Sequence, residues 1–345
     1  MADPRDAAST AKLCWCSDAE PGIKRKAGKG GFRYKDHDGD VVQDAKTLDR
    51  IKLLAIPPAW TDVWIAPDEN CHLQATGRDQ RGRKQYRYHG RWTQVRGESK
   101  FATLAAFCEA LPGLRKAVER DLRQRRLSRE KVLATIVWLL DNTMVRVGNA
   151  AYARDNGNFG LTTLRDKHAD IMGSTLELSF RGKSGKDWNL KVADRRIANA
   201  VRKSQELPGQ TLFQYLEDDG TRRAVKSQDV NQYIRENSDN DFTSKHFRTW
   251  GGTIHAASLL ARTERPESKT ARKKMLNSVI DNVAGRLGNT RSVCRQCYIH
   301  PAVLEAWLTG GLPDGMARAN KGKRRIEGLD DEEALVLRWL AREGD

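Results

Sequence analysis

Two patterns of apolar positions divide the chain and predict different structures in its two parts. Between residues 30 and 95, apolar and polar residues alternate over short runs that glycine, proline and aspartate interrupt, which is typical of strands and turns. The clearest strand candidates are Trp64-Ile65, residues 73–76 and the stretch around Tyr86 and Tyr88. One short helix is expected at residues 47–54, ended by Pro57-Pro58.

From about residue 98 onward, the apolar positions follow the helical period of about 3.6 residues. Ser128 is suited to cap a helix N-terminus. After it, one apolar face comprises Leu133, Ile136, Val137, Leu140, Met144 and Val147. Gly148-Asn149 is expected to end or bend this helix.

A β-hairpin with a basic tip interrupts the helical part. Its two strands are predicted by the alternation of Leu176, Leu178 and Phe180, and then of Trp188, Leu190 and Val192, on either side of a turn at residues 182–185. Helices are expected from residue 193 to about 308. Residues 310–328 are predicted as a loop, and residues 330–342 as a short amphipathic helix.

Charge then indicates the kind of partner. The 345 residues carry 61 Lys and Arg against 45 Asp and Glu, a formal net charge of +16. Such an excess favours a polyanion, with nucleic acid ahead of an anionic membrane surface. No apolar run approaches the ~20 residues that span a bilayer, and residues 1–20 lack the basic-then-apolar order of an export signal. A hydrophobic content of 39% supports a packed core.

These features predict an α+β protein with three parts. Residues 1–24 are expected to form a flexible N-terminal arm, and residues 25–97 a small β-rich domain that binds DNA. Residues 98–345 are expected to form a larger, mostly helical catalytic domain with a small β-hairpin. Two lobes joined near residues 94–100 suit a clamp around duplex DNA.

Six cysteines do not make a disulfide scaffold in a chain of this length. Without an export signal, they are expected to be reduced thiols in a cytosol. Cys294-x-x-Cys297 has the spacing of half a zinc site, but no second Cys or His pair follows at a suitable distance. We therefore predict neither a metal site nor a redox pair there.

The sequence between residues 287 and 301 places one tyrosine, Tyr298, near cationic side chains. Cutting a phosphodiester needs an in-line nucleophile, cations for the charge that develops on the phosphate, and an acid for the leaving alkoxide. No paired carboxylates offer a metal for these roles, so Arg146, Lys183 and Arg248 are the candidates. Each of the four residues alone has an ordinary interpretation, as a packed or a solvated side chain. Gly182-Lys183-Ser184 is not a phosphate-binding loop, because residue 177 is Glu where that motif needs glycine.

Taken together, the motifs resemble the type IB DNA topoisomerases of the compact, poxvirus-like kind that is also found in bacteria. The resemblance covers roughly residues 30 to 310 and rests on these stretches: Ile56-Pro57-Pro58-Ala59-Trp60-Thr61-Asp62-Val63-Trp64-Ile65, Gly82-Arg83-Lys84-Gln85-Tyr86-Arg87-Tyr88-His89, Val145-Arg146-Val147-Gly148-Asn149, Phe159-Gly160-Leu161-Thr162-Thr163-Leu164, Phe180-Arg181-Gly182-Lys183-Ser184-Gly185-Lys186, Phe247-Arg248-Thr249-Trp250-Gly251 and Tyr298-Ile299-His300-Pro301. Each stretch alone is a weak signal, and their order makes the set specific.

The resemblance implies the chemistry. Tyr298 would attack the phosphodiester and form a 3′-phosphotyrosyl link, while Arg146 and Arg248 would stabilise the transition state. Lys183 would protonate the leaving 5′-oxygen. Asn289 stands where poxvirus and nuclear members carry histidine, so it can donate a hydrogen bond but cannot become cationic. Such enzymes use neither ATP nor an obligatory metal.

The N-terminal basic stretch predicts contacts to DNA. Its charged residues are Arg78, Arg81, Arg83, Lys84, Arg87 and Arg91, with Asp79 opposing them. A run of this sort is usually a solvated face, but interleaved Gln and Tyr can contact bases and phosphates. The resemblance implies DNA contacts at Arg83, Gln85, Tyr86 and Tyr88, and packing within the strand is the alternative for one of the tyrosines. Lys245 is also expected to bind DNA.

Two other interpretations share these features. A tyrosine recombinase would use the same Arg, Lys, Arg and Tyr chemistry, but recombinases usually carry His where Lys245 stands, and the motif at residues 82–89 belongs to the topoisomerases. A non-catalytic nucleoid protein would explain the charge alone, with salt-sensitive binding and no nicking. The expected protein is a monomer without a cofactor, located in the cytoplasm on the nucleoid.

Overall fold

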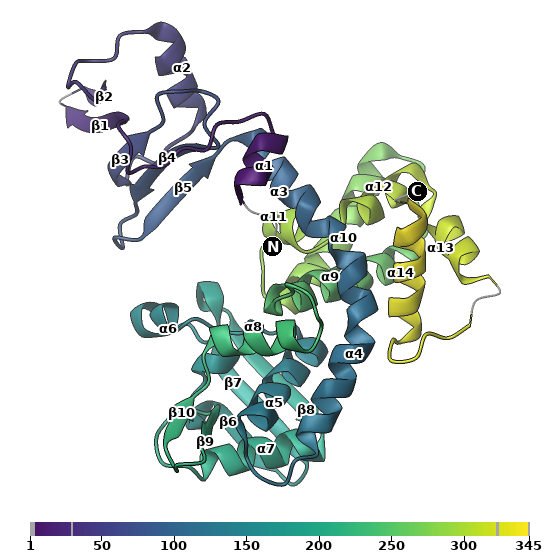
Figure 1. The fold of residues 1–345 in the computed structure, drawn as a ribbon. Coiled ribbons are helices and arrows are strands. Elements are labelled where there is room, and N and C mark those ends of the chain that lie inside the picture. Colours follow the sequence, from purple (N-terminus) through teal and green to yellow (C-terminus); the bar gives the residue numbers. More distant parts are fainter. Residues whose placement is uncertain (1–3, 29, 322–323, 344–345) are drawn as a thin grey trace. The chain divides into compact units, whose positions relative to one another are not determined.

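The computed structural model describes residues 4–28, 30–321 and 324–343 (Figure 1). The chain splits into two compact units, Met1–Ala102 and Thr103–Asp345. The sequence placed the boundary between residues 97 and 98, and the units divide instead after helix α3 (Gly90–Ala102).

The first unit is built on an antiparallel sheet with the strand order β2-β1-β3-β4-β5 among the described residues (Figure 1). The strands are β1 (Ile23–Gly28), β2 (Gly31–Lys35), β3 (Thr61–Ile65), β4 (Leu73–Arg78) and β5 (Lys84–Tyr88). Helix α2 (Ala45–Leu53) begins at Asp44, whose carboxylate accepts a hydrogen bond of 2.8 Å from the backbone N–H of Thr47. Ile51 of this helix packs with Ile23 and Ile65 of the sheet, so the alternation found in the sequence marks one buried face.

The N-terminal segment packs against this sheet. Helix α1 (Pro4–Thr10) is followed by a β-bridge between Cys14 and Cys71, and a disulfide joins Cys16 to Cys71. The prediction that all cysteines are reduced thiols is therefore wrong for this pair. Its partners lie 55 residues apart, and only the folded sheet brings them together. The buried side chains of Ala8 and Leu13 also argue against the predicted flexible arm over residues 4–24, while residues 1–3 of that arm lie outside the described residues.

The second unit is mostly helical and contains one antiparallel sheet of β6, β7 and β8 (Figure 1). Its helices and strands are α4 (Leu104–Leu122), α5 (Arg129–Thr143), α6 (Ala150–Asn156), β6 (Ala169–Met172), β7 (Thr175–Arg181), β8 (Asp187–Ala193), α7 (Arg195–Gln205), β9 (Gln214–Leu216), β10 (Arg222–Ala224), α8 (Ser227–Glu236), α9 (Ser244–Ala261), α10 (Lys269–Leu287), α11 (Arg291–Cys297), α12 (Pro301–Thr309), α13 (Leu312–Asn320) and α14 (Asp331–Glu343). The α+β class is confirmed, as are the hairpin β7–β8 and the C-terminal helix. No helix in the described part of the chain is both long and apolar enough to cross a membrane.

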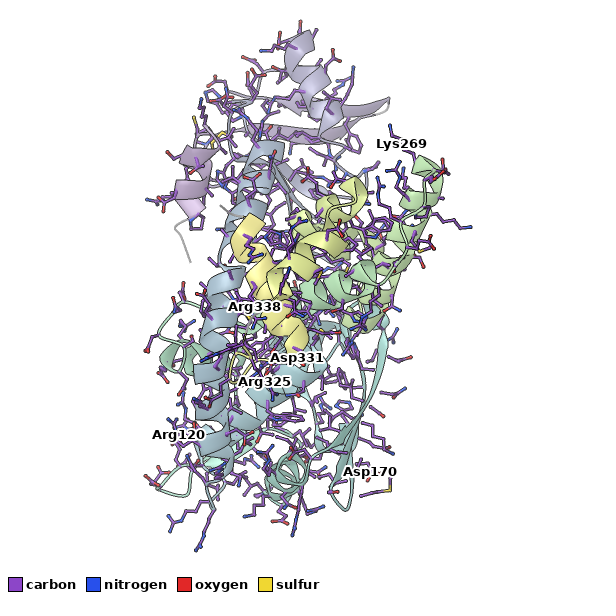
Figure 2. The ribbon with its side chains drawn as sticks, turned by 90° about the vertical axis from the view of Figure 1, so that its right-hand side faces the viewer. Arg120, Asp170, Lys269, Arg325, Asp331 and Arg338 are labelled. Carbon is purple, nitrogen blue, oxygen red and sulfur yellow. A yellow bond between two sulfur atoms is a disulfide. The ribbon has the colours of Figure 1, made fainter. Side chains whose placement is uncertain are left out.

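Two segments have a different secondary structure from the one predicted. Residues 310–328 were expected to be a loop, but they contain α13, in which Leu312 and Met316 are buried. Residues 193–308 were expected to be helical throughout, but they also contain the short pair β9–β10. The pair is too short to leave an alternating pattern in the sequence. Charged side chains such as Asp170 on β6 and Lys269 on α10 project from the surface of this unit (Figure 2).

Helix α5 begins as predicted and ends earlier than predicted. The Ser128 hydroxyl accepts a hydrogen bond of 3.2 Å from the Lys131 N–H, which caps the helix. The helix stops at Thr143, because Met144 adopts a left-handed conformation with φ 55°. Met144 therefore closes the helix, and the chain turns away before Val147. This early stop sets the position of the next residue pair, Val145-Arg146.

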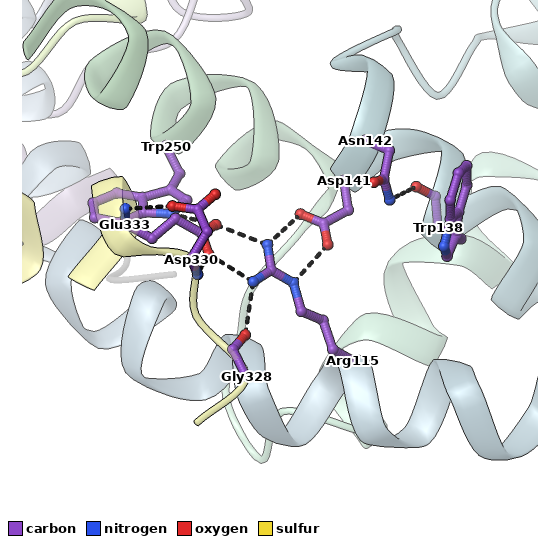
Figure 3. A network of polar contacts seen from close by, with 8 residues as sticks. All are labelled: Arg115, Trp138, Asp141, Asn142, Trp250, Gly328, Asp330 and Glu333. Carbon is purple, nitrogen blue, oxygen red and sulfur yellow. Dashed lines mark hydrogen bonds and ion pairs between the residues drawn. The ribbon is translucent and has the colours of Figure 1, made fainter. Parts of the chain in front are cut away.

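A buried ion-pair network joins the C-terminal helix to the rest of the unit (Figure 3). Arg115 of α4 forms ion pairs of 2.7 Å with Asp141 of α5 and with Glu333 of α14. Burial acts to lower the pKa of Arg115, but its hydrogen bonds to both carboxylates outweigh burial and raise that pKa. The indole N–H of Trp250 on α9 donates to Glu333 over 3.3 Å. Glu333 thus connects α14 to α4 and α9.

Replacing Glu333 by glutamine is expected to lower the free energy of unfolding by about 3 kcal/mol, because it removes the buried carboxylate that pairs with the partly buried Arg115. Urea unfolding measures this change. Glu332→Gln is the control, since Glu332 pairs with Arg262 at the surface and such pairs contribute under about 1 kcal/mol. Equal effects of the two substitutions would contradict a specific role of Glu333.

Candidate active site

Arg248 lies at the centre of the predicted catalytic residues. It is on α9, its side chain is 3% exposed, and its two terminal nitrogens donate to backbone carbonyls. One carbonyl is that of Met144, which closes α5, and the other is that of Leu287, 2.7 Å away, the last residue of α10. The carbonyls at a helix C-terminus have no partner within the helix, so a buried guanidinium satisfies them well.

Each of these carbonyls lies two residues before another predicted site residue, Arg146 and Asn289 respectively. Arg248 therefore ties together the two loops that carry them. The loops also meet directly, because Arg146 donates a hydrogen bond from Nη2 to the amide oxygen of Asn289. Gly288 makes the turn into the second loop possible, since it ends α10 in a left-handed conformation with φ 59°.

The guanidinium of Arg146 is partly buried and remains a cation. Burial, and then the charge of Arg248, lower the pKa of Arg146, the nearby Tyr298 opposes both, and together they bring this pKa to about 10. A pKa of about 10 still leaves the group protonated at neutral pH. Burial also lowers the pKa of Arg248, and Tyr298 again opposes it. The two cations and the tyrosine are thus mutual neighbours.

Tyr298 follows α11, and its backbone N–H donates to the carbonyl of Cys294 over 2.9 Å. Thr290 caps the start of this short helix by accepting from the Val293 N–H. The Cζ atom of Arg248 lies 5.0 Å from the centroid of the Tyr298 ring, which is within cation–π range. Tyr298 is half-buried, so its ring is held while one side stays accessible to a ligand.

Three buried donors at these residues have no hydrogen-bond acceptor among the described residues. They are Nη1 of Arg146, Nε of Arg248 and Nδ2 of Asn289. Buried polar groups are nearly always paired in folded proteins, so donors of this kind indicate a ligand that supplies acceptors. An anion with several oxygens, such as a phosphodiester, fits two guanidinium groups and an amide.

Lys183 lies at the tip of the β7–β8 hairpin, in the turn Lys183–Gly185, and its side chain is exposed. The same tip reaches the loop of Asn289, because Lys186 donates from Nζ to the Asn289 carbonyl over 3.3 Å. Trp188 strengthens this connection. A Cβ atom built on Gly182 or on Gly288 would lie 2.7 Å from the Trp188 ring, so both glycines lie directly against that ring. The hairpin tip is therefore anchored beside Asn289, within the same unit as Tyr298.

Gly252 on α9 packs directly against the backbone of Tyr298. A Cβ atom at Gly252 would lie 2.6 Å from the Tyr298 carbonyl oxygen, closer than any real contact. The next residue, Thr253, accepts a hydrogen bond of 3.1 Å from the His300 N–H. Gly252 and Trp188 were not among the site residues predicted from the sequence, where Trp188 was named only as a strand residue of the hairpin. A pair of glycines inside a helix, Gly251-Gly252, was the available signal for close backbone approach.

Gly252→Ala is expected to slow DNA cleavage by about 10²-fold, because a shift of about 1 Å in a reacting group has an effect of that size. Single-turnover cleavage of a labelled duplex measures it. Gly285→Ala on α10 is the control, since a Cβ atom there meets nothing within 4 Å. A Gly252→Ala protein as fast as wild type would show that the contact does not position Tyr298.

Four of the five predicted DNA-binding residues lie in the first unit. Arg83, Gln85, Tyr86 and Tyr88 belong to the first unit, on and just before β5. Asp79 holds two of them, through an ion pair of 2.7 Å to Arg83 and a hydrogen bond of 3.0 Å from Gln85. Tyr86 and Tyr88 are both exposed, and their rings stack nearly parallel at 5.9 Å.

Lys245 is exposed on the first turn of α9, three residues before Arg248. The structure thus brings together Arg146, Arg248, Asn289 and Tyr298, with Lys183 on the adjacent hairpin tip.

Comparison with known families shows the family of the chain. Residues 89–309 match the model of the eukaryotic DNA topoisomerase I catalytic core, and residues 31–79 match that of the bacterial DNA topoisomerase IB N-terminal domain. The chain belongs to the type IB DNA topoisomerase family. It is therefore an enzyme that acts on DNA, an isomerase, and its N-terminal region is similar to the bacterial form.

Individual relatives cover most of the chain. DNA topoisomerase 1B of Acanthamoeba polyphaga mimivirus is 34% identical over 293 residues, which are 83% of this chain and 87% of the viral protein. DNA topoisomerase 1B of Vaccinia virus (strain Copenhagen) is 20% identical over 287 residues, which are 80% of this chain and 88% of that protein. Membership of the family favours a topoisomerase over a recombinase or a non-catalytic nucleoid protein.

Proposed function

We propose that this topoisomerase relaxes positive and negative supercoils by cutting one DNA strand with Tyr298. The tyrosine oxygen forms a bond to the phosphorus, the bond from phosphorus to the 5′-oxygen breaks, and a 3′-phosphotyrosyl link and a free 5′-hydroxyl result. The cut strand swivels, and the 5′-hydroxyl then attacks the link to reseal it. The energy of the broken bond is kept in the link, so the reaction proceeds without ATP and without an obligatory metal.

The observation that carries this proposal is the position of the Tyr298 ring against the buried Arg248, beside the unpaired donors of Arg146 and Asn289. In our account the two guanidinium groups and the amide bind the non-bridging phosphate oxygens and stabilise the charge that develops there. Lys183 protonates the leaving 5′-oxygen from the hairpin tip. Asn289 cannot ionise, so no histidine titration from this position is expected in the pH profile.

We further propose that the exposed cations and rings of both units contact the duplex. Arg83, Gln85, Tyr86 and Tyr88 act from the first unit and Lys245 from the second, so that the two units form a clamp on DNA. One tyrosine suffices for a single-strand cut, and the protein is therefore proposed to act as a monomer. Because its substrate is DNA, we propose that it is located in the cytoplasm on the nucleoid.

Relaxation of supercoiled plasmid tests the proposal, with wild type and Tyr298→Phe compared in EDTA and without ATP. Stepwise relaxation by wild type and none by the variant is the expected result. Because the variant keeps the ring and loses only the hydroxyl, it should still bind the plasmid. Relaxation by Tyr298→Phe would refute the assigned nucleophile, and a requirement of wild type for metal would refute the metal-independent mechanism.

A further inference from the structure

The disulfide of the first unit attaches the segment around Trp15 to the sheet. Cys16 is bonded to Cys71, and the backbone on both sides of Trp15 is hydrogen-bonded to the same edge of the fold. The backbone N–H of His72 donates to the Cys14 carbonyl over 2.9 Å, and the backbone N–H of Cys16 donates to the ring atom Nδ1 of His72 over 3.2 Å. Burial lowers the pKa of His72, which favours the neutral ring that this bond requires. Trp15 is thus placed by its two neighbours in the chain.

Trp15 forms one end of a series of neighbouring rings, which are stacked except for the tilted pair of His72 and Trp92. Its indole lies on His72 with ring centroids 3.9 Å apart and an interplanar angle of 6°. The series continues through Trp92, 5.4 Å from His72, to Tyr88, 4.4 Å from Trp92. Tyr88 in turn stacks with Tyr86. The series therefore connects Trp15 to the two tyrosines that we propose contact DNA.

The exposure of the three rings Trp15, Tyr86 and Tyr88 distinguishes the series from a buried aromatic core. Trp15 is 44% exposed, a fraction between those of Tyr88 at 41% and Tyr86 at 46%. Cations accompany the rings, with Lys84 lying 5.7 Å over Tyr86 and Arg96 lying 5.5 Å over Trp92. Exposed rings interleaved with cations are the combination by which proteins bind nucleic acids, through stacking and phosphate contacts.

We propose that Trp15 is a further DNA contact, and that the Cys16–Cys71 disulfide keeps it in the ring series so that DNA affinity depends on the redox state of this pair. The proposal rests on the DNA-binding role assigned above to Tyr86 and Tyr88. A dithiol reductant supplies two electrons and two protons to the sulfur–sulfur bond, which yields two thiols and the oxidised reductant. The segment then remains attached by non-covalent contacts alone, among them its hydrogen bonds to His72, and the Trp15 ring is released from His72. Disulfides in reducing compartments are commonly of this reversible kind.

The binding constant of a fluorescein-labelled duplex, measured by fluorescence anisotropy with and without dithiothreitol, tests the proposal. Thiol counts verify the two states, since Cys14, Cys108, Cys294 and Cys297 lie outside the disulfide of the oxidised protein. Trp15→Ala and Cys16→Ser are each expected to weaken binding about tenfold, within the range found for single stacking side chains. Dithiothreitol should weaken wild type by a similar factor and should leave both variants unchanged.

Cys14→Ser is the matched control, because Cys14 is an exposed free thiol two residues from Cys16. It should bind like wild type and keep the response to dithiothreitol.

Tyr86→Ala and Tyr88→Ala distinguish a failure of the Trp15 proposal from a failure of the proposed DNA-binding role of Tyr86 and Tyr88. If they weaken binding and Trp15→Ala does not, the role of Trp15 is refuted; if neither tyrosine matters, the DNA-binding role of this face is refuted. If Cys16→Ser does not fold, the test rests on two other measurements, namely the binding of wild type in dithiothreitol and the binding of Trp15→Ala. Unchanged DNA affinity in both would overturn the proposal.

Discussion

Replacing Arg248 by alanine is expected to lower the single-turnover rate of DNA cleavage by about 10³-fold. The removal of one preorganised donor to a developing oxyanion costs about 10²- to 10³-fold, and Arg248 has a second role. Its terminal nitrogens bind the carbonyls of Met144 and Leu287, so its loss also releases the loops of Arg146 and Asn289. Rapid-quench cleavage of an end-labelled duplex measures the rate.

Arg248→Lys separates charge from geometry. Lysine keeps the positive charge but cannot bind two carbonyls in the planar arrangement of a guanidinium. We expect it to remain at least about 10²-fold slower than wild type. Arg262→Ala, at the other end of α9, changes an exposed arginine and should cleave normally. A fast Arg248→Lys protein would show that charge alone is sufficient and that the bridging of the two loops is not needed.

Lys183→Ala is expected to slow cleavage by about 10³-fold, within the usual range of about 10²- to 10⁴-fold for general acid catalysis. A substrate with sulfur in place of the leaving 5′-oxygen should restore most of the rate. A thiol has a pKa of about 8.5, far below that of an alcohol, so the sulfur leaves without a proton. The ratio of the two cleavage rates, sulfur over oxygen, measures the role of Lys183 directly.

Lys186→Ala is the appropriate comparison, because Lys186 lies on the same hairpin tip and binds the Asn289 carbonyl. It is expected to slow both substrates by the same modest factor. If sulfur rescued Lys186→Ala and not Lys183→Ala, the acid would be Lys186.

The sequence predicted those parts of the fold that depend on local pattern. Ser128 and the apolar face after it gave the start of α5, and alternation around residues 176–192 gave the hairpin. The end of α5 could not be predicted, because Met144 is a non-glycine residue that closes the helix in a left-handed conformation. The Cys16–Cys71 disulfide was missed for a similar reason, since the pairing depends on where the sheet places Cys71.

The candidate site was likewise predictable only in part. Residue types and the family resemblance named Arg146, Arg248, Asn289 and Tyr298 but did not show how they are held. The contacts that hold these residues join distant parts of the sequence. Arg248 donates hydrogen bonds to carbonyls at two helix ends, which lie 104 and 39 residues away in the sequence. The contacts of Gly252 with Tyr298, and of Trp188 with Gly288, are likewise visible only in the folded chain.

The most direct test of the central claim is identification of the covalent intermediate. A duplex that loses a short 3′-terminal fragment of the cut strand on cleavage cannot be resealed, so it traps the protein on the remaining part of that strand. Proteolysis and mass spectrometry of the trapped complex should locate a 3′-phosphate of the DNA on Tyr298, with a free 5′-hydroxyl on the released fragment. An adduct on another residue, or cleavage that leaves no adduct, would contradict the account.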